Sequence, residues 1–126
     1  MIASKHYTEA DFQRCNPSCS MQDMNQGTIN RLDKATDIAG FKFRLTSAAR
    51  TIEHEKSKGR AGTSSHISNN FGSRAIDIAT PDSRTRFKVM QGLIGAGFNR
   101  IGVNLVSNFF HADDSVNHDQ DVLFTY

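Results

Sequence analysis

Apolar positions recur at helical spacing in two stretches of this chain. The first stretch lies within residues 22–38, and Gly40 follows it where a glycine commonly ends a helix. The second lies near residues 83–96, and Pro81 precedes it as a helix opener. The inner stripe of this second helix is predicted to comprise Phe87, Met90, Leu93 and Ile94. Both stretches are therefore expected to be amphipathic helices that cover a core.

Two shorter helical segments are also expected. In "YTEADF", residues 7–12, Thr8 is placed to cap a helical turn. The polar segment 51–59 favours a helix that ends at Gly59. Residues 60–73 are rich in Gly, Ser and Asn and are predicted to form a loop.

Short alternating runs predict strands, and most of them come late in the chain. "FKFRLT" at 41–46 alternates apolar with charged residues, which is typical of a half-buried strand. "RAIDIA" at 74–79 predicts a second strand. Two further strands are expected at 98–105 and 108–113, joined by a tight turn, and a closing strand at 121–126. Helices followed by clustered strands favour an α+β fold with a mainly antiparallel sheet.

Length and composition limit the possible classes of protein. The 126 residues, 37% of them hydrophobic, predict one domain over residues 1–126 that acts as a monomer. The sequence has no apolar run of about 18 residues, so no membrane span is expected. The first residues lack the apolar centre of a signal peptide, which predicts synthesis in a cytoplasm. A formal net charge of +2 is too small to indicate nucleic acid, and we expect no such partner.

The strand "RAIDIA" carries an acidic residue in an apolar setting. Because strand side chains alternate between faces, Ile76 and Ile78 face one way and Asp77 faces the other, between Ala75 and Ala79. The two alanines leave room for an ion or a substrate beside the carboxylate. A buried carboxylate must be paired, hydrogen-bonded or bound to a metal. Asp77 is thus either a hydrogen-bonded structural residue or a ligand.

Two histidines extend this pattern. His66 lies in the polar loop, and His111 lies in the aromatic strand "FFHAD". With Asp77 they form two imidazoles and one carboxylate, which are the protein ligands of a catalytic zinc site whose fourth position is open to water. A non-haem iron site uses the same donors. Its further downstream histidine could only be His118, which lies too close in sequence.

Two other patterns carry weaker interpretations. Cys15 and Cys19 could form a local disulfide or remain thiols, and a zinc knuckle would need two more ligands nearby that the sequence does not offer. Acidic and polar residues alternate over 113–121 as in a calcium loop, but Phe124 occupies the position of the closing glutamate. We expect a solvated acidic turn there.

Four segments in this order, "SAAR", "SSH…RAIDI", "GFNRIGV" and "FFHAD", carry a family resemblance. They resemble the zinc peptidases that cut D-alanyl peptides of bacterial cell walls, among them D-Ala-D-Ala carboxypeptidases and phage endolysin peptidases. The family pattern is Ser-x-His-x-x-Gly-x-Ala-x-Asp, with a later strand histidine. Ser64 and His66 match its start, and Ala75 and Asp77 match its end. "HYTEADF" and the terminal "FTY" also resemble the ends of the family, so the resemblance covers nearly the whole chain.

This resemblance implies a Hedgehog/DD-peptidase-like fold and a set of site residues. By it, His66, Asp77 and His111 would be ligands of a Zn²⁺ cofactor. Arg50 would stabilise the scissile carbonyl or hold substrate, for which a permanently charged, forked guanidinium is suited. Ser64 would hydrogen-bond the substrate, although a plain loop serine is also consistent with its position.

Two departures from the family pattern bear on the site. Ten residues separate His66 from Asp77, more than in the pattern, so the extra residues either bulge outward or widen the site. Many relatives have a glutamate three residues before the last ligand, and Asn108 holds that position here. Asp113, two residues after His111, is then the candidate general base, and orientation of a ligand histidine is the equally open alternative.

The resemblance implies a zinc-dependent peptidase of peptidoglycan stem peptides. D-Ala-D-Ala carboxypeptidase and L-Ala-D-Glu endopeptidase activities are both open. Zinc would lower the pKa of its water from ~16 towards ~7 and so supply hydroxide at neutral pH, with Asp113 as proton acceptor. A phage endolysin or lysis enzyme is expected, acting on the cell wall after release through a phage-made membrane lesion or as part of a virion. The alternative is a non-catalytic zinc-containing binding module of the same fold.

Overall fold

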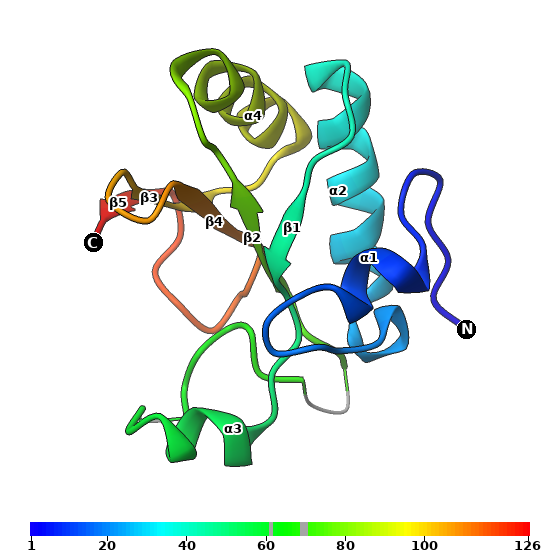
Figure 1. Ribbon diagram of the computed structural model, residues 1–126, viewed down its shortest axis with the longest axis vertical. Coiled ribbons are helices and arrows are strands. Elements are labelled where there is room, and N and C mark those ends of the chain that lie inside the picture. Colours follow the sequence, from blue (N-terminus) through cyan, green and yellow to red (C-terminus); the bar gives the residue numbers. More distant parts are fainter. Residues whose placement is uncertain (61, 69–70) are drawn as a thin grey trace.

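One mixed sheet organises the chain, with helices before and between its strands (Figure 1). The structure is a computed structural model and describes residues 1–60, 62–68 and 71–126. The elements in chain order are α1 (Glu9–Gln13), the 3₁₀ helix η1 (Met21–Asp23), α2 (Gln26–Ala39), β1 (Leu45–Ser47), α3 (Ile52–Ser57), β2 (Ala75–Ala79), α4 (Ser83–Ala96), β3 (Arg100–Asn104), β4 (Phe109–Asp113) and β5 (Val122–Thr125). The expected α+β class is confirmed.

The sheet has the strand order β1-β2-β4-β3-β5. Its pairings are antiparallel except for β5, which lies parallel to β3. The register aligns one residue of each strand in a row: Ser47, Asp77, His111, Gly102 and Phe124. Directly paired residues point to the same face, so this row brings residues far apart in sequence to one side of the sheet.

The opposite face of the sheet packs against α2 and α4. Ile76 and Ile78 of β2 are fully buried there, as the alternation of "RAIDIA" predicts. The same cluster holds Leu32 of α2 and Leu93 of α4, and the two helices lie side by side in Figure 1. Burial of each such side chain contributes about 1.5 to 3 kcal/mol, so this layer fixes the strands that carry the row.

The stripe predicted for α4 is wrong in two of its positions. Phe87 and Ile94 are 70% and 60% exposed, whereas Leu93 is fully buried. The buried positions of the helix are Val89, Gly92, Leu93 and Ala96. The reason is the close approach of α2: a Cβ added at Gly92 would lie 2.4 Å from the carbonyl oxygen of Ala35. A glycine therefore stands at the closest contact with α2, whereas Phe87 and Ile94 face outwards.

The ends of the elements follow the local sequence with one shift. Gly40 has a φ of 82° and ends α2, as predicted from its position. The strand expected over 41–46 begins later, because pairing with β2 starts only where Leu45 faces Ile78. Phe43 is nevertheless buried in the core. Among the described residues, the helices are all too short or too polar to cross a membrane.

Candidate metal centre

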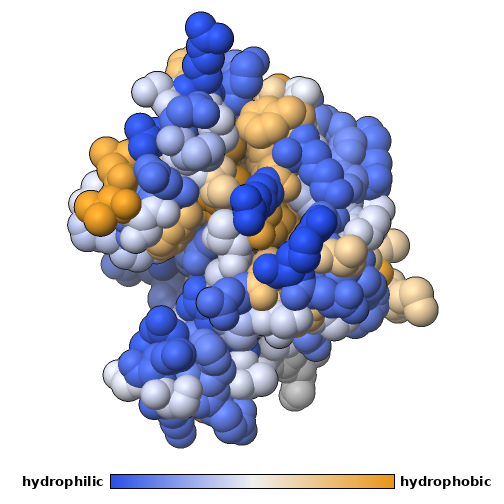
Figure 2. Space-filling model, in the orientation of Figure 1, coloured by the Kyte–Doolittle hydropathy of each residue, from blue (hydrophilic) through white to orange (hydrophobic). Residues whose placement is uncertain are grey.

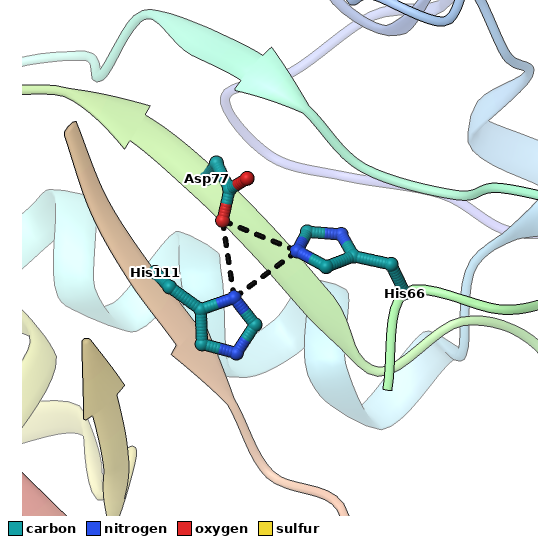
Figure 3. A group of neighbouring side chains, drawn as sticks. All are labelled: His66, Asp77 and His111. Atoms are coloured by element: carbon teal, nitrogen blue, oxygen red, sulfur yellow. Dashed lines mark hydrogen bonds and ion pairs between the residues drawn. The ribbon is translucent and has the colours of Figure 1, made fainter. Parts of the chain in front are cut away.

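The three predicted ligands lie together on the open face of the sheet (Figure 3). Asp77 is the middle residue of β2, His111 is its direct partner on β4, and His66 reaches them from the loop before β2. His66 Nε2 and His111 Nδ1 are 3.0 Å apart, and each lies 3.1 Å from Asp77 Oδ1. All three residues are buried. The three atoms form a nearly equilateral triangle.

This triangle matches the dimensions of a small tetrahedral metal ion. A zinc ion with bonds of about 2.0 to 2.1 Å holds its ligand atoms about 3.3 Å apart. The observed separations are only slightly shorter, so zinc would fit with little movement of the side chains. In the part of the chain that the structure describes, no other group of three His, Cys, Asp or Glu side chains converges in this way.

The hydrogen bonds behind the two histidines fix which nitrogen faces the triangle. His66 Nδ1 lies 2.7 Å from the carbonyl oxygen of Ala48, which can only accept, so Nδ1 carries the hydrogen. His111 Nε2 donates to Asp113 Oδ2 at 2.6 Å. Both facing nitrogens therefore present lone pairs towards the Asp77 carboxylate, an arrangement that needs a cation to be stable. Neutral ligand histidines are commonly held by such backbone and carboxylate acceptors.

Without a metal, a proton is the cation available to this cluster. Burial by itself would lower the pKa of His111, but its hydrogen bonds with Asp113 and Asp77 raise that pKa to about 9. Burial would raise the pKa of Asp77, yet the charges and hydrogen bonds of His66 and His111 hold it well below its usual value. Both shifts have the same cause, because the Asp77 carboxylate and a positively charged imidazole stabilise each other at this site.

Asp113 lies on the far side of the His111 ring from the triangle. Its Oδ2 also accepts from Ser65 Oγ at 3.0 Å, and its Oδ1 accepts from Arg100 Nε at 2.7 Å and from the Ser115 amide at 3.1 Å. Burial would raise the pKa of Asp113, but its hydrogen bond with His111 and the other donors lower it. This placement matches the ligand-orienting interpretation of Asp113. A general base would need a carboxylate on the cavity side of the ring.

Arg50 secures the oxygen of Asp77 that points away from the triangle. Its Nη2 contacts Asp77 Oδ2 at 3.3 Å, and its Nε and Nη2 donate to Ser47 Oγ at 3.1 and 2.9 Å. Its Nη1 contacts Glu55 Oε1 at 3.2 Å. Since Asp77 is held on this side, its Oδ1 remains directed at the two histidines.

A cavity of about 300 Å³ opens next to the triangle. It is lined by Arg50, Arg60, Ser64, His66, Asp77, Phe109, His111 and Tyr126. Ser64 Oγ also accepts from the His66 amide at 3.1 Å, so this serine shapes the turn that presents the histidine. Tyr126 is 66% exposed as a residue, but the partial desolvation of its phenol and nearby Asp77 raise its pKa to about 12, so the phenol is a protonated donor.

The loop between the ligands returns to the sheet along the start of α2. The amide of Ser73 donates to the Asp23 carbonyl at 2.9 Å, and the Ser73 carbonyl accepts from Asn25 at 2.9 Å. Gly72 has a φ of +84°, and a Cβ there would lie 2.5 Å from the Met24 carbonyl carbon. These contacts fix where the chain enters β2, and the Arg50 amide, which donates to the His66 carbonyl at 2.8 Å, holds the other end of the loop. Part of the extra sequence, residues 69–70, lies outside the described residues.

The other sequence patterns do not join this centre. His118, which an iron site would require, contacts Ser115 Oγ and the carbonyl oxygen of Thr63, both at 3.0 Å. Cys15 and Cys19 are free thiols. Asn108, at the position of the family glutamate, has a φ of 55° and accepts a hydrogen bond from Arg86 of α4 at 2.8 Å instead of lining the cavity.

Several residues that support the site were not identified from the sequence. They are Glu55, Arg60, Ser65, Arg100 and Phe124. Arg100 lies within the segment "GFNRIGV", which carries part of the family resemblance but does not indicate that Arg100 contacts Asp113. Glu55 lies in a polar helix, where a glutamate would ordinarily be exposed, and no pattern in the sequence indicates its burial.

Comparison with known proteins agrees with this geometry. A family model described as peptidase M15 matches residues 5–113, a range that contains His66, Asp77 and His111. Searches of curated proteins and of solved structures gave no significant match. The match covers most of the chain and ends just after the last of the three converging residues. The chain therefore belongs to the M15 family of zinc peptidases, whose fold is Hedgehog/DD-peptidase-like.

Proposed function

We propose that the protein is a zinc-dependent peptidase that hydrolyses peptide bonds in peptidoglycan stem peptides. The observation that carries this proposal is the triangle of lone pairs from His66, Asp77 and His111 in the wall of a cavity. Zinc bound there would supply an activated water and polarise the scissile carbonyl. Membership of the M15 family supports both the metal and the reaction.

The side chains around the metal centre offer hydrogen-bond donors for the substrate. Arg50 is mostly committed to Ser47, Glu55 and Asp77, and of its five N–H donors one, on Nη1, is left for a substrate oxygen. The neutral phenol of Tyr126 is a second donor for the charge that develops on the scissile carbonyl. Ser64 is positioned to hydrogen-bond the peptide backbone at the cavity wall.

One observation favours a second candidate, a zinc-containing binding module without turnover. Among the side chains of the described residues that line the cavity, Asp77 is the only carboxylate, and it would be bound to the metal. A peptidase of this type usually has a separate base to accept the proton of the attacking water. A module of the same fold would keep the zinc and bind a peptide without cutting it.

Mass spectrometry of purified peptidoglycan incubated with the zinc-loaded protein separates these functions. Release of D-alanine would identify a carboxypeptidase, and new peptides that begin with D-Glu would identify an endopeptidase. We expect cleavage to stop on chelation, to return when zinc is added, and to be absent in His66→Ala and Asp77→Ala. His54→Ala, a change outside the metal centre, is the matched control and should cut normally. A protein that retains stoichiometric zinc and leaves peptidoglycan intact would be the binding module.

We further propose a setting for this activity, a lysis enzyme such as a phage endolysin that acts on the cell wall. The proposal rests on the resemblance of the chain to phage endolysin peptidases. If it holds, the protein expressed in the cytoplasm should lyse bacteria only after the inner membrane is permeabilised. Lysis that is equally fast with an intact membrane, or absent in permeabilised cells, would contradict it.

A further inference from the structure

A buried glutamate joins the two arginines of the cavity. Glu55 of α3 is fully buried, and its Oε1 and Oε2 lie 3.2 Å from Arg50 Nη1 and Arg60 Nη1. The part of the surface over α3 that Figure 2 shows is mostly hydrophilic, although Ile52 at the start of the helix is 45% exposed. Removing a carboxylate from water in such a short polar helix is costly unless the charge is paired. The pairing is therefore the reason for its burial, and it fixes the two guanidiniums relative to each other.

The two arginines differ in how many of their donors are already used. Arg50 is 15% exposed and also contacts Ser47 and Asp77. The side chain of Arg60 is 51% exposed, and among the described residues its guanidinium contacts only Glu55. Since Arg60 lines the cavity, its remaining N–H groups are available to a bound molecule.

The net charge of the cavity indicates which kind of chemical group a bound molecule would carry. Glu55 offsets one of the two guanidiniums, and Asp77 offsets the other through Arg50 Nη2. A divalent ion at the triangle would then leave the cavity with an excess of positive charge. Among the side chains of the described lining, Asp77 is the only carboxylate, and it is already paired with Arg50. An anionic group of the substrate would be attracted to Arg60, and a carboxylate suits the forked guanidinium.

We propose that Arg60 is the specificity-determining residue that binds a substrate carboxylate next to the scissile bond, and that Glu55 positions it. The proposal rests on the peptidase function proposed above and names the feature of the peptide that this site selects. Arg60 is held twice, because its backbone amide also donates to the Glu55 carbonyl at 3.0 Å. Stem peptides offer two such groups: the terminal carboxylate of D-Ala-D-Ala and the free α-carboxylate of γ-linked D-Glu.

Three synthetic peptides test the proposal and distinguish the two sources. They are N-acetyl-L-Ala-γ-D-Glu-L-Lys-D-Ala-D-Ala, its terminal carboxamide, and its D-isoglutamine form. For the zinc-loaded protein, one of the two amides should lower kcat/KM about 10- to 100-fold, as expected for one lost charged hydrogen bond, and that amide identifies the carboxylate. In the Arg60→Gln variant, kcat/KM for the parent peptide should fall by the same factor, while kcat/KM for the amide that identified the carboxylate should be unchanged.

Two further variants complete the test. Arg84→Gln removes the same charge from an exposed position of α4 and should keep the full preference. Glu55→Gln should lose part of the preference through a raised KM, with zinc content unchanged, because it acts only by positioning. If Arg60→Gln lowers kcat/KM equally for all three peptides, or for none of them, the proposal is overturned.

Binding separates this proposal from the proposed function. If the wild type cuts no peptide, isothermal titration of the same three peptides gives the same comparison through Kd. A preference for the carboxylate that Arg60→Gln abolishes would then sustain the role of Arg60 and reject only the peptidase activity. Binding that shows no such preference, or no detectable binding, would reject the role of Arg60.

Discussion

Replacing Asp113 by asparagine separates its two possible functions. The carboxylate accepts four hydrogen bonds, from His111, Ser65, Arg100 and Ser115. The side-chain amide of asparagine has the same shape, but only its oxygen can accept hydrogen bonds. Its NH₂ group would replace the other carboxylate oxygen and face two donors. About two bonds to a charged group are lost, at about 1.5 kcal/mol each or more, and Arg100 loses its partner, so we expect about 3 to 5 kcal/mol of destabilisation.

The effect on the metal is the more informative result. Without the carboxylate, the tautomer and orientation of His111 are no longer fixed, so zinc affinity should fall about 10- to 100-fold. Activity at saturating zinc should then recover to within about tenfold of the wild type, because Asp113 is not in the cavity. Competition with a chromogenic chelator measures the affinity, and peptide cleavage over a zinc titration measures the activity. Asp37→Asn, which removes an exposed charge, is the control and should change neither quantity.

The opposite result would refute this reasoning. If Asp113→Asn binds zinc as tightly as the wild type and has lost activity at every zinc concentration, the carboxylate is the general base. Urea unfolding of both variants shows whether a loss of activity reflects a loss of folded protein.

Three other predictions follow from the same structure. Since the pKa of His111 in the metal-free site is raised to about 9, a metal must displace a proton from it at neutral pH. Zinc affinity should therefore rise about tenfold for each pH unit between pH 7 and 9. Calorimetric titration in buffers of different ionisation heat should show about one proton released at pH 7. Gly102→Ala would place a Cβ 2.4 Å from the Phe124 ring, whose centroid lies 5.8 Å from that of the His111 ring. The substitution should therefore lower the free energy of unfolding in urea by about 1 to 3 kcal/mol and weaken zinc binding. Leu93→Ala should cost about 2 to 5 kcal/mol and Phe87→Ala less than about 0.5 kcal/mol; equal costs would contradict the observed packing of α4.

Much of the fold was predictable because its signals are local. Period-two alternation in "RAIDIA" placed Asp77 opposite the core, and the glycine after residue 39 placed the end of α2. The three converging residues were identified because two histidines and an acidic residue on an apolar strand make a metal-binding set, and because the segments that carry them resemble the zinc peptidases. The stripe of α4 was not, since it depends on the distance to α2, which no periodicity within α4 encodes.

The sequence by itself determined the elements, the α+β class and the three converging residues. Only the tertiary structure decided how those residues are supported: Asp113 lies behind the His111 ring, Glu55 is buried between two arginines, and Arg60 keeps N–H groups that Glu55 does not use. The physical reason is that a side chain's chemistry depends on its partners. Hydrogen-bond partners are set by strand register and loop closure between segments distant in sequence, whereas helix caps and alternation are set within a few residues.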